Sequence, residues 1–194
     1  MAKRYEELLK YVRRVKPSTI TEIGTWNGDR AIAMAKEALK HNTVVRYTGF
    51  SLFEDGTNET DAEEFNVKEH VSLEAVTAKL EAFAKDHDGF SFHLIKGNTR
   101  YTLKKRIIFN DFAFIDGGHS VETINSDYQA LAGCKFIVFD DFYSGKNPNV
   151  DIRKVGCNVL VASLMGEGKN VSIVPPRDKV KGGGFVQLAV LDNR

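Results

Sequence analysis

Three aspartates and a histidine lie where short apolar runs end, in positions that suit chemistry. Asp116 and His119 bracket a pair of glycines after one run, and Asp140 and Asp141 follow another. Carboxylates are hard oxygen ligands that suit Mg²⁺, Ca²⁺ or Mn²⁺. Histidine, with an unperturbed pKa near about 6.5, can accept a proton. These residues predict a metal site with a nearby base. The alternative is that Asp116 orders its turn while Asp140 and Asp141 are solvated or pair with Lys and Arg.

A glycine turn with an acid before it is the second chemical feature. The stretch TITEIGTWNGDR predicts a buried strand, a tight turn and a helix start, and Glu22, Gly24 and Gly28 form the pattern E-x-G-x-x-x-G. Glycine lets a ligand approach the backbone because no Cβ stands in the way, and the first N–H groups of the helix then point at that ligand. The spacing differs from G-x-G-x-x-G, the dinucleotide fingerprint.

Strands alternate with helices along the chain, which implies a largely parallel sheet with helices on both faces. The last two strands have no helix between them, so they form an antiparallel hairpin at one edge. The predicted strands cover residues 19–23, 43–50, 90–95, 112–115 and 135–139, with two more within 171–192. The predicted helices cover residues 5–15, 31–40, 72–85, 121–132 and 150–164, with a turn into a short helix over 97–103.

Polar residues recur at the end of each parallel strand. Ligands of open α/β sheets bind outside the carboxyl ends of the strands. The candidate positions are Glu22–Gly24, Ser51–Glu54, Gly97–Thr99, Asp116–His119 and Asp140–Asp141. Their recurrence predicts one shared site. The acidic residues 57–68 predict a solvated surface loop beside it, with a lid as the alternative.

Length and composition limit the class of protein. The 194 residues suit one domain over 1–194, with an amphipathic helix within residues 1–17. Lys and Arg number 27 and Asp and Glu 26, so we expect no nucleic-acid partner. No apolar run has the length of a membrane span and no signal peptide is visible, so we expect no membrane partner. Two cysteines without metal-motif spacing, Cys134 and Cys157, predict buried thiols in a cytoplasmic protein.

Four motifs in this order resemble class I S-adenosylmethionine-dependent methyltransferases, from about Thr19 to Asp192. TEIGTWNG is similar to the first motif, GNTRYTL to the adenine-side turn, FIDGGHSVETINSDYQAL to the fourth motif and IVFDDF to the end of the fifth strand. The IDGGHS and VFDD pair resembles small-molecule O-methyltransferases of the "methyltransferase domain" family and, distantly, metal-dependent catechol- and macrocin-type enzymes. The resemblance implies a Rossmann-like sandwich: a seven-stranded, mostly parallel sheet with a C-terminal antiparallel hairpin and helices on both faces.

The resemblance also implies which residues bind S-adenosylmethionine. They are Glu22, Gly24, Trp26, Asn27, Gly28, Ser51, Asn98, Thr99, Asp116, Gly117 and His119. Glu22 is expected to hold the turn or to accept from the ammonium group of the cofactor. Trp26 is expected beside the cofactor, with an ordinary core position as the alternative.

One departure from the family concerns the ribose. An acid usually ends the second strand and holds both ribose hydroxyls, but Ser51 stands there. A serine has one uncharged oxygen and cannot copy a bidentate contact. Glu54 or Asp55 is expected to take its place; otherwise the affinity for the cofactor is lower.

The resemblance implies catalytic roles for His119 and Asp116. The lysine and aspartate bases of catechol- and macrocin-type enzymes have no counterpart, because glycine and Ser120 stand at those places. His119 is the remaining base; its alternative is stacking on adenine or a backbone hydrogen bond. Asp116, Asp140 and Asp141 match positions that hold a divalent metal, such as Mg²⁺, in those enzymes.

The function expected is methyl transfer to a hydroxyl group of a small-molecule acceptor, such as a sugar or a phenol. Ser51 and the missing lysine keep open a second interpretation, a cofactor-binding module with weak or no transfer activity. A nicotinamide-dependent oxidoreductase is disfavoured by the absence of G-x-G-x-x-G. An oligomer is compatible with this sequence.

Overall fold

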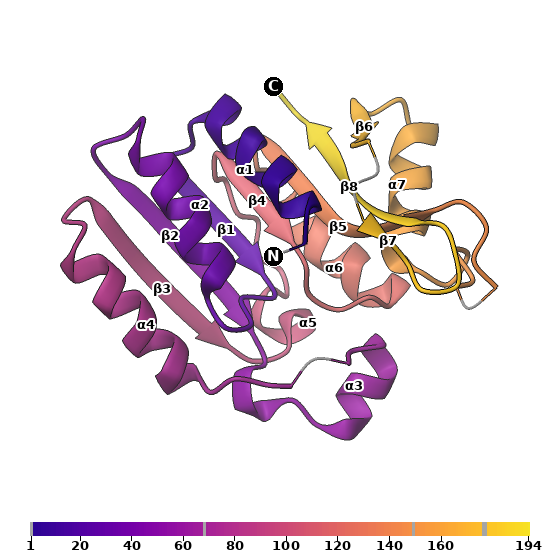
Figure 1. Ribbon diagram of the computed structural model, residues 1–194, viewed down its shortest axis with the longest axis horizontal. Coiled ribbons are helices and arrows are strands. Elements are labelled where there is room, and N and C mark those ends of the chain that lie inside the picture. The colour runs from indigo at the N-terminus through magenta and orange to yellow at the C-terminus, as the bar shows by residue number, and fades with distance from the viewer. Residues whose placement is uncertain (1, 68, 149, 176–177) are drawn as a thin grey trace.

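A computed structural model describes residues 2–67, 69–148, 150–175 and 178–194. Its strands are β1 Thr19–Ile23, β2 Val45–Ser51, β3 Phe90–Lys96, β4 Phe112–Ile115, β5 Phe136–Ser144, β6 Val171–Ile173, β7 Asp178–Lys179 and β8 Phe185–Asp192. They form one sheet in the order β3-β2-β1-β4-β5-β8-β6, and β7 pairs with β8 (Figure 1). Strands β1 to β5 are parallel, whereas β8 runs antiparallel to β5 and β6. The predicted sheet and C-terminal hairpin are confirmed, and the two-residue β7 is an addition.

Helices cover both faces of the sheet. They are α1 Arg4–Val15, α2 Asp29–Leu39, α3 Asn58–Glu64, α4 Leu73–Lys85, α5 Thr99–Thr102, α6 Val121–Leu131 and α7 Gly156–Gly166, with a 3₁₀ turn η1 Phe53–Asp55. Helices α1, α2 and α4 share one core with alternate strand residues such as Phe112 and Phe114, and α6 and α7 share the other with Ala113 and Ile115 (Figure 1). Side chains alternate across a strand, so β4 contributes to both cores.

Three differences from the predicted elements have local causes. Residues 57–68 were expected as a loop, but α3 forms because Thr57 and Thr60 exchange side-chain and backbone hydrogen bonds in a capping box. The helix expected from residue 150 begins only at Gly156, since Asp151 bonds the backbone N–H and guanidinium of Arg153 in a turn. Strand β5 extends past residue 139 because its second half also pairs with β8.

Both cysteines are buried and free, as predicted. Among the described residues, we find no helix with the length and apolar character needed to cross a membrane.

Candidate active site

The glycine turn brings the ends of β1 and β4 into contact. Gly24 has a φ of 90°, and a Cβ there would lie 1.9 Å from the carbonyl oxygen of Asp116. Gly28 caps α2 with a φ of 77°, and its Cβ would face Val76 of α4 at 3.2 Å. Both glycines therefore allow close approach of the chain to itself. Gly24 lines a cavity, whereas Gly28 lies outside its wall, and the expectation that both make room for a ligand stays a prediction.

Arg30 holds this turn together from inside the protein. Its Nε donates to Oε1 of Glu22 at 3.2 Å, and its Nη2 donates to the carbonyl oxygen of Gly24 at 2.9 Å. The same Nη2 lies 2.7 Å from Oδ2 of Asp116. Burial lowers the pKa of Arg30, but the charges of Asp116 and Glu22 outweigh it and leave that pKa above its ordinary value. Of the two roles expected for Glu22, holding the turn is the one that its contacts support.

A cavity of about 130 Å³ opens at the carboxyl ends of the parallel strands. Eight of the residues predicted to bind the cofactor lie in its wall: Gly24, Trp26, Ser51, Asn98, Thr99, Asp116, Gly117 and His119. Three others lie outside the wall: Glu22, Asn27 and Gly28. Glu22 is fully buried beneath the turn. The Asn27 amide donates to the Asp29 carboxylate at 2.8 Å and so faces the start of α2.

Residues 57–67 and 69–70, which we call the lid segment, form part of the cavity wall. The Glu64 carboxylate accepts hydrogen bonds from the backbone N–H of Ser120 at 2.9 Å and from the hydroxyl of Thr123 at 2.5 Å. Trp26 donates through Nε1 to the carbonyl oxygen of Glu69 at 2.9 Å. Figure 1 shows α3 beyond the arrowheads of β1 to β3. The lid geometry, which was the alternative interpretation, is the arrangement that these contacts support.

Ser51 lies in the cavity wall, but the acids expected to replace its missing carboxylate do not. Glu54 and Asp55 pair with the ammonium group of Lys96 at 3.0 and 3.1 Å, outside the wall. A role of Glu54 or Asp55 in ribose binding stays a prediction. The carboxylates that line the cavity with Ser51 are Asp116 and, from the lid segment, Asp61, Glu64 and Glu69.

His119 and Asp141 form a pair at the mouth of this cavity. Nδ1 of His119 lies 3.2 Å from Oδ2 of Asp141. Asp141 has a φ of 58° and lies where the pairing of β5 with β8 shifts between Phe139 and Phe142. An irregularity of this kind re-aims a side chain next to a site, and left-handed backbone at a non-glycine residue is strained. Strand β5 thus turns the Asp141 carboxylate toward His119.

A second cavity, of about 490 Å³, adjoins the first. His119 and Asn66 lie in the walls of both. The other residues of the second wall are Arg4, Phe65, Val67, Asp141, Tyr143, Val150, Asp151, Lys154 and Val155. His119 therefore lies between a cavity at the strand ends and a larger one lined by apolar, aromatic and charged side chains.

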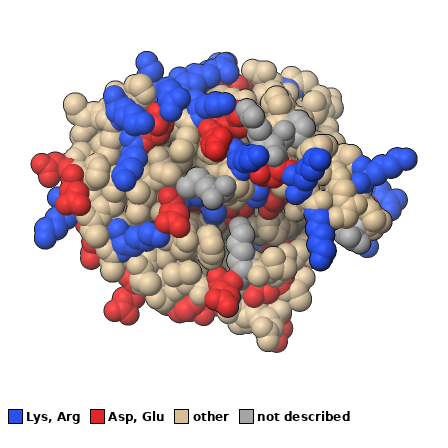
Figure 2. Space-filling view, in the orientation of Figure 1, with Lys and Arg blue, Asp and Glu red and all other residues tan. Residues whose placement is uncertain are grey.

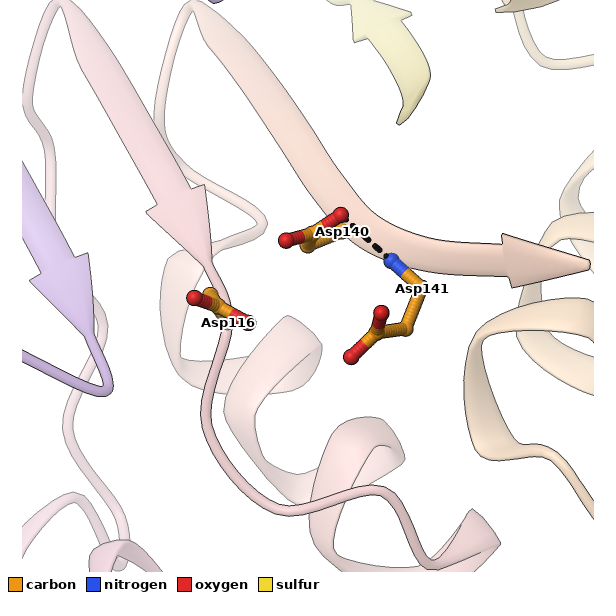
Figure 3. Close-up of side chains that lie close together, drawn as sticks. All are labelled: Asp116, Asp140 and Asp141. Atoms are coloured by element: carbon orange, nitrogen blue, oxygen red, sulfur yellow. Dashed lines mark hydrogen bonds between the residues drawn. The ribbon is translucent and has the colours of Figure 1, made fainter. Parts of the chain in front are cut away.

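The three predicted metal ligands do come together. Asp116, Asp140 and Asp141 each offer an oxygen within 4.8 Å of the others (Figure 3). Two arginines enter the same cluster: Arg30 contacts Asp116, and Nε of Arg4 lies 2.6 Å from Oδ1 of Asp140. The alternative that Asp140 and Asp141 pair with a cation is therefore confirmed, since Arg4 also lies 3.6 Å from Asp141. Metal binding by these carboxylates stays a prediction.

Tyr5 completes this cluster. Its hydroxyl donates to Oδ2 of Asp140 at 2.9 Å. Burial raises the pKa of Tyr5, and the charges of Asp116 and Asp140 raise it further, so the phenol stays protonated. Sequence reasoning missed Arg4, Tyr5 and Arg30. The sequence signal that could have indicated them is that all three residues lie in the first turn of an amphipathic helix, α1 or α2.

Charges on the surface are mixed. Figure 2 shows Lys and Arg side chains interspersed with Asp and Glu over the face that it presents.

Comparisons with known proteins agree with this geometry. Residues 21–141 match the sequence profile of a family described as "methyltransferase domain". No curated protein sequence matches the chain. The O-methyltransferase TomG of Streptomyces achromogenes, solved with S-adenosylmethionine, is 16% identical with a TM-score of 0.59, over 98% of this chain and 79% of that one. An O-methyltransferase of Bacillus cereus, solved with S-adenosylhomocysteine, is 15% identical with a TM-score of 0.60, over 97% and 80%. The methyltransferase domain of bacterial CtHen1 is 12% identical with a TM-score of 0.62, over 97% of both chains.

Proposed function

Because the chain belongs to the methyltransferase domain family and has the class I fold, we propose that it transfers the methyl group of S-adenosylmethionine to a hydroxyl group of a small molecule. The observation that supports this proposal best is the position of His119 between the two cavities, paired with Asp141. We place the enzyme in the cytoplasm, where buried thiols such as Cys134 and Cys157 stay reduced.

The residues of the first cavity suit S-adenosylmethionine. Its wall combines the apolar residues Phe50 and Leu52 with the polar residues Asn98 and Thr99, a combination that suits an adenine ring. Asp116 and the lid carboxylates suit a cofactor that carries an ammonium and a sulfonium charge. Arg30 also lines the cavity, where Glu22, Gly24 and Asp116 hold its guanidinium.

Base catalysis is the role that the geometry supports for His119. S-adenosylmethionine, when bound, supplies a sulfonium methyl group for in-line displacement by an oxygen nucleophile. Asp141 accepts from Nδ1–H and so favours the tautomer in which Nε2 carries no proton. Nε2 then takes the hydroxyl proton of the acceptor as the oxygen–carbon bond forms. Asp116, held by Arg30, is a positioning residue on the cofactor side.

The second cavity is the proposed acceptor site. Tyr143, Val150 and Val155 give it an apolar wall, and Asp141 and Lys154 give it charged groups. A cavity of about 490 Å³ lies within the range of small-molecule sites.

Calorimetric titration with S-adenosylhomocysteine tests the cofactor, and methyl release with a panel of phenols and sugars tests the transfer. We expect binding and turnover with at least one hydroxyl compound. Binding without turnover on any acceptor would favour a cofactor-binding module. Absence of binding at millimolar ligand, together with quenching of NADH fluorescence, would instead indicate a nicotinamide site.

A further inference from the structure

The first turn of α1 carries a cation into the acidic cluster at the strand ends. Nε and Nη2 of Arg4 donate to the two oxygens of Asp140 at 2.6 and 3.1 Å, which is a bidentate contact. The Arg4 side chain is only 14% exposed and that of Asp140 is fully buried. A buried, bidentate guanidinium–carboxylate pair is among the strongest polar contacts in proteins.

The backbone places Arg4 there in advance. Asp178 of β7 accepts hydrogen bonds from the backbone N–H groups of Lys3 and Arg4, both at 3.0 Å. Its carboxylate also lies 3.4 Å from Nη1 of Arg4. The start of α1 is therefore fixed to the C-terminal part of the sheet, although the two lie more than 170 residues apart in the chain.

Two cations already lie in the cluster. Arg4 and Arg30 together bring two positive charges to its three carboxylates, which is the charge that one divalent cation would bring. A metal bound by Asp140 would have to displace both the guanidinium of Arg4 and the hydroxyl of Tyr5. Breaking such a pair leaves a buried charge uncompensated, which costs several kcal/mol. The residues present therefore do not suit a divalent metal.

We infer that Arg4, together with Arg30, occupies the place of a divalent cation in this site, so that methyl transfer needs no metal and α1 is part of the active site. The inference rests on the proposed function. Arg4 lines the second cavity and lies 3.6 Å from Asp141, which in turn contacts His119. Arg4 is thus a positioning residue that holds Asp140 and lies beside Asp141 at the proposed acceptor site.

Manganese binding tests this without relying on activity. Free Mn²⁺ is measured by its electron paramagnetic resonance signal with the wild type, Arg4→Ala, and the double variant Arg4→Ala with Asp140→Asn. We expect no stoichiometric binding by the wild type, binding roughly tenfold tighter or more in Arg4→Ala, and its loss in the double variant. Arg14→Ala, an exposed position on the same helix, is the matched control. Stoichiometric Mn²⁺ binding by the wild type that Asp140→Asn abolishes would overturn the inference.

Measurements of methyl-transfer activity provide a second test of the inference. Wild-type turnover should be the same in excess EDTA and in added Mg²⁺, and Arg4→Ala should lose most of kcat with partial rescue by free guanidinium. Arg4→Lys keeps the positive charge but cannot make the bidentate contact with Asp140. This variant replaces Arg4→Ala in the test if Arg4→Ala does not fold. A folded Arg4→Ala with full, metal-independent activity would contradict a role for α1. The S-adenosylhomocysteine titration is read separately, so failure of the proposed function is distinguishable from failure of this inference.

Discussion

Nδ1 of His119 lies 3.2 Å from Oδ2 of Asp141, although one residue follows β4 and the other belongs to the irregular part of β5. The pair fixes one side of the imidazole, and His119 lies in the walls of both cavities. Base catalysis needs both side chains. The Asp141 carboxylate selects the tautomer of the imidazole, and the position of the ring decides which proton the imidazole can accept.

Replacing His119 should slow the chemical step and spare cofactor binding. We expect His119→Gln to lower kcat by roughly 10²–10⁴, which is the usual contribution of a general base. Steady-state kinetics with a hydroxyl acceptor measures the change, and calorimetry with S-adenosylhomocysteine should give an affinity close to that of the wild type. His41→Gln, an exposed position away from both cavities, is the control. An unchanged kcat in His119→Gln would contradict base catalysis and favour the alternative interpretation, in which His119 stacks on adenine.

Removing Arg30 should destabilise the protein as a whole. Arg30→Met leaves the buried carboxylates of Glu22 and Asp116 without their guanidinium, and breaking such a pair costs about 3–5 kcal/mol. Urea unfolding followed by circular dichroism gives the free energy of unfolding. Arg153→Met, which removes an exposed pair with Asp151, should leave that free energy unchanged. Equal effects of the two substitutions would contradict a structural role for Arg30.

Releasing the lid should weaken cofactor binding. Glu64→Ala removes the acceptor for Ser120 and Thr123, so the lid segment must be ordered by the ligand itself. We expect an affinity for S-adenosylhomocysteine lower by roughly tenfold and faster hydrogen exchange over the lid segment. Glu74→Ala, an exposed position of α4 outside the cavity wall, should change neither. Unchanged exchange in Glu64→Ala would show that other contacts hold the lid.

Asp127 should make stability depend on pH. Burial raises the pKa of this carboxyl to about 7, with the charge of Glu64 adding to the effect and the Thr99 hydroxyl opposing it. The unfolded value is about 3.9, so the folded state binds more protons between these values. This contribution to the free energy of unfolding is present in full below about pH 4 and is lost as the pH rises through 7.

Asp127→Asn should remove that slope. Urea unfolding of both proteins at several pH values from 5 to 8 checks it, and the wild-type curve should fall more steeply than that of the variant. Asp151→Asn, an exposed acid, should follow the wild type. Parallel curves for the wild type and Asp127→Asn would show that Asp127 does not titrate in this range.

The parallel arrangement of the strands could be predicted from the alternation of apolar runs and helical periodicity, whereas their order in the sheet could not. The same pattern placed Asp116, Asp140 and Asp141 at one edge, because the carboxyl ends of parallel strands meet there. Helix α3 could not be predicted from periodicity, since its residues are polar and acidic and none is buried. Its stability comes from the Thr57 cap and from tertiary bonds such as those of Glu64.

The sequence by itself determined the sheet, the glycine turn and the cluster of carboxylates, because these follow from local periodicity and from where strands end. Only the tertiary structure decided what meets those carboxylates. Arg4 and Asp140 lie 136 positions apart, and the contact exists because α1 and β5 pack into one fold. The position of Arg30 beneath the turn depends likewise on the close approach of Gly24 to Asp116. Long-range pairing has no signature in sequence spacing, so the cation of the site was visible only once the chain was folded.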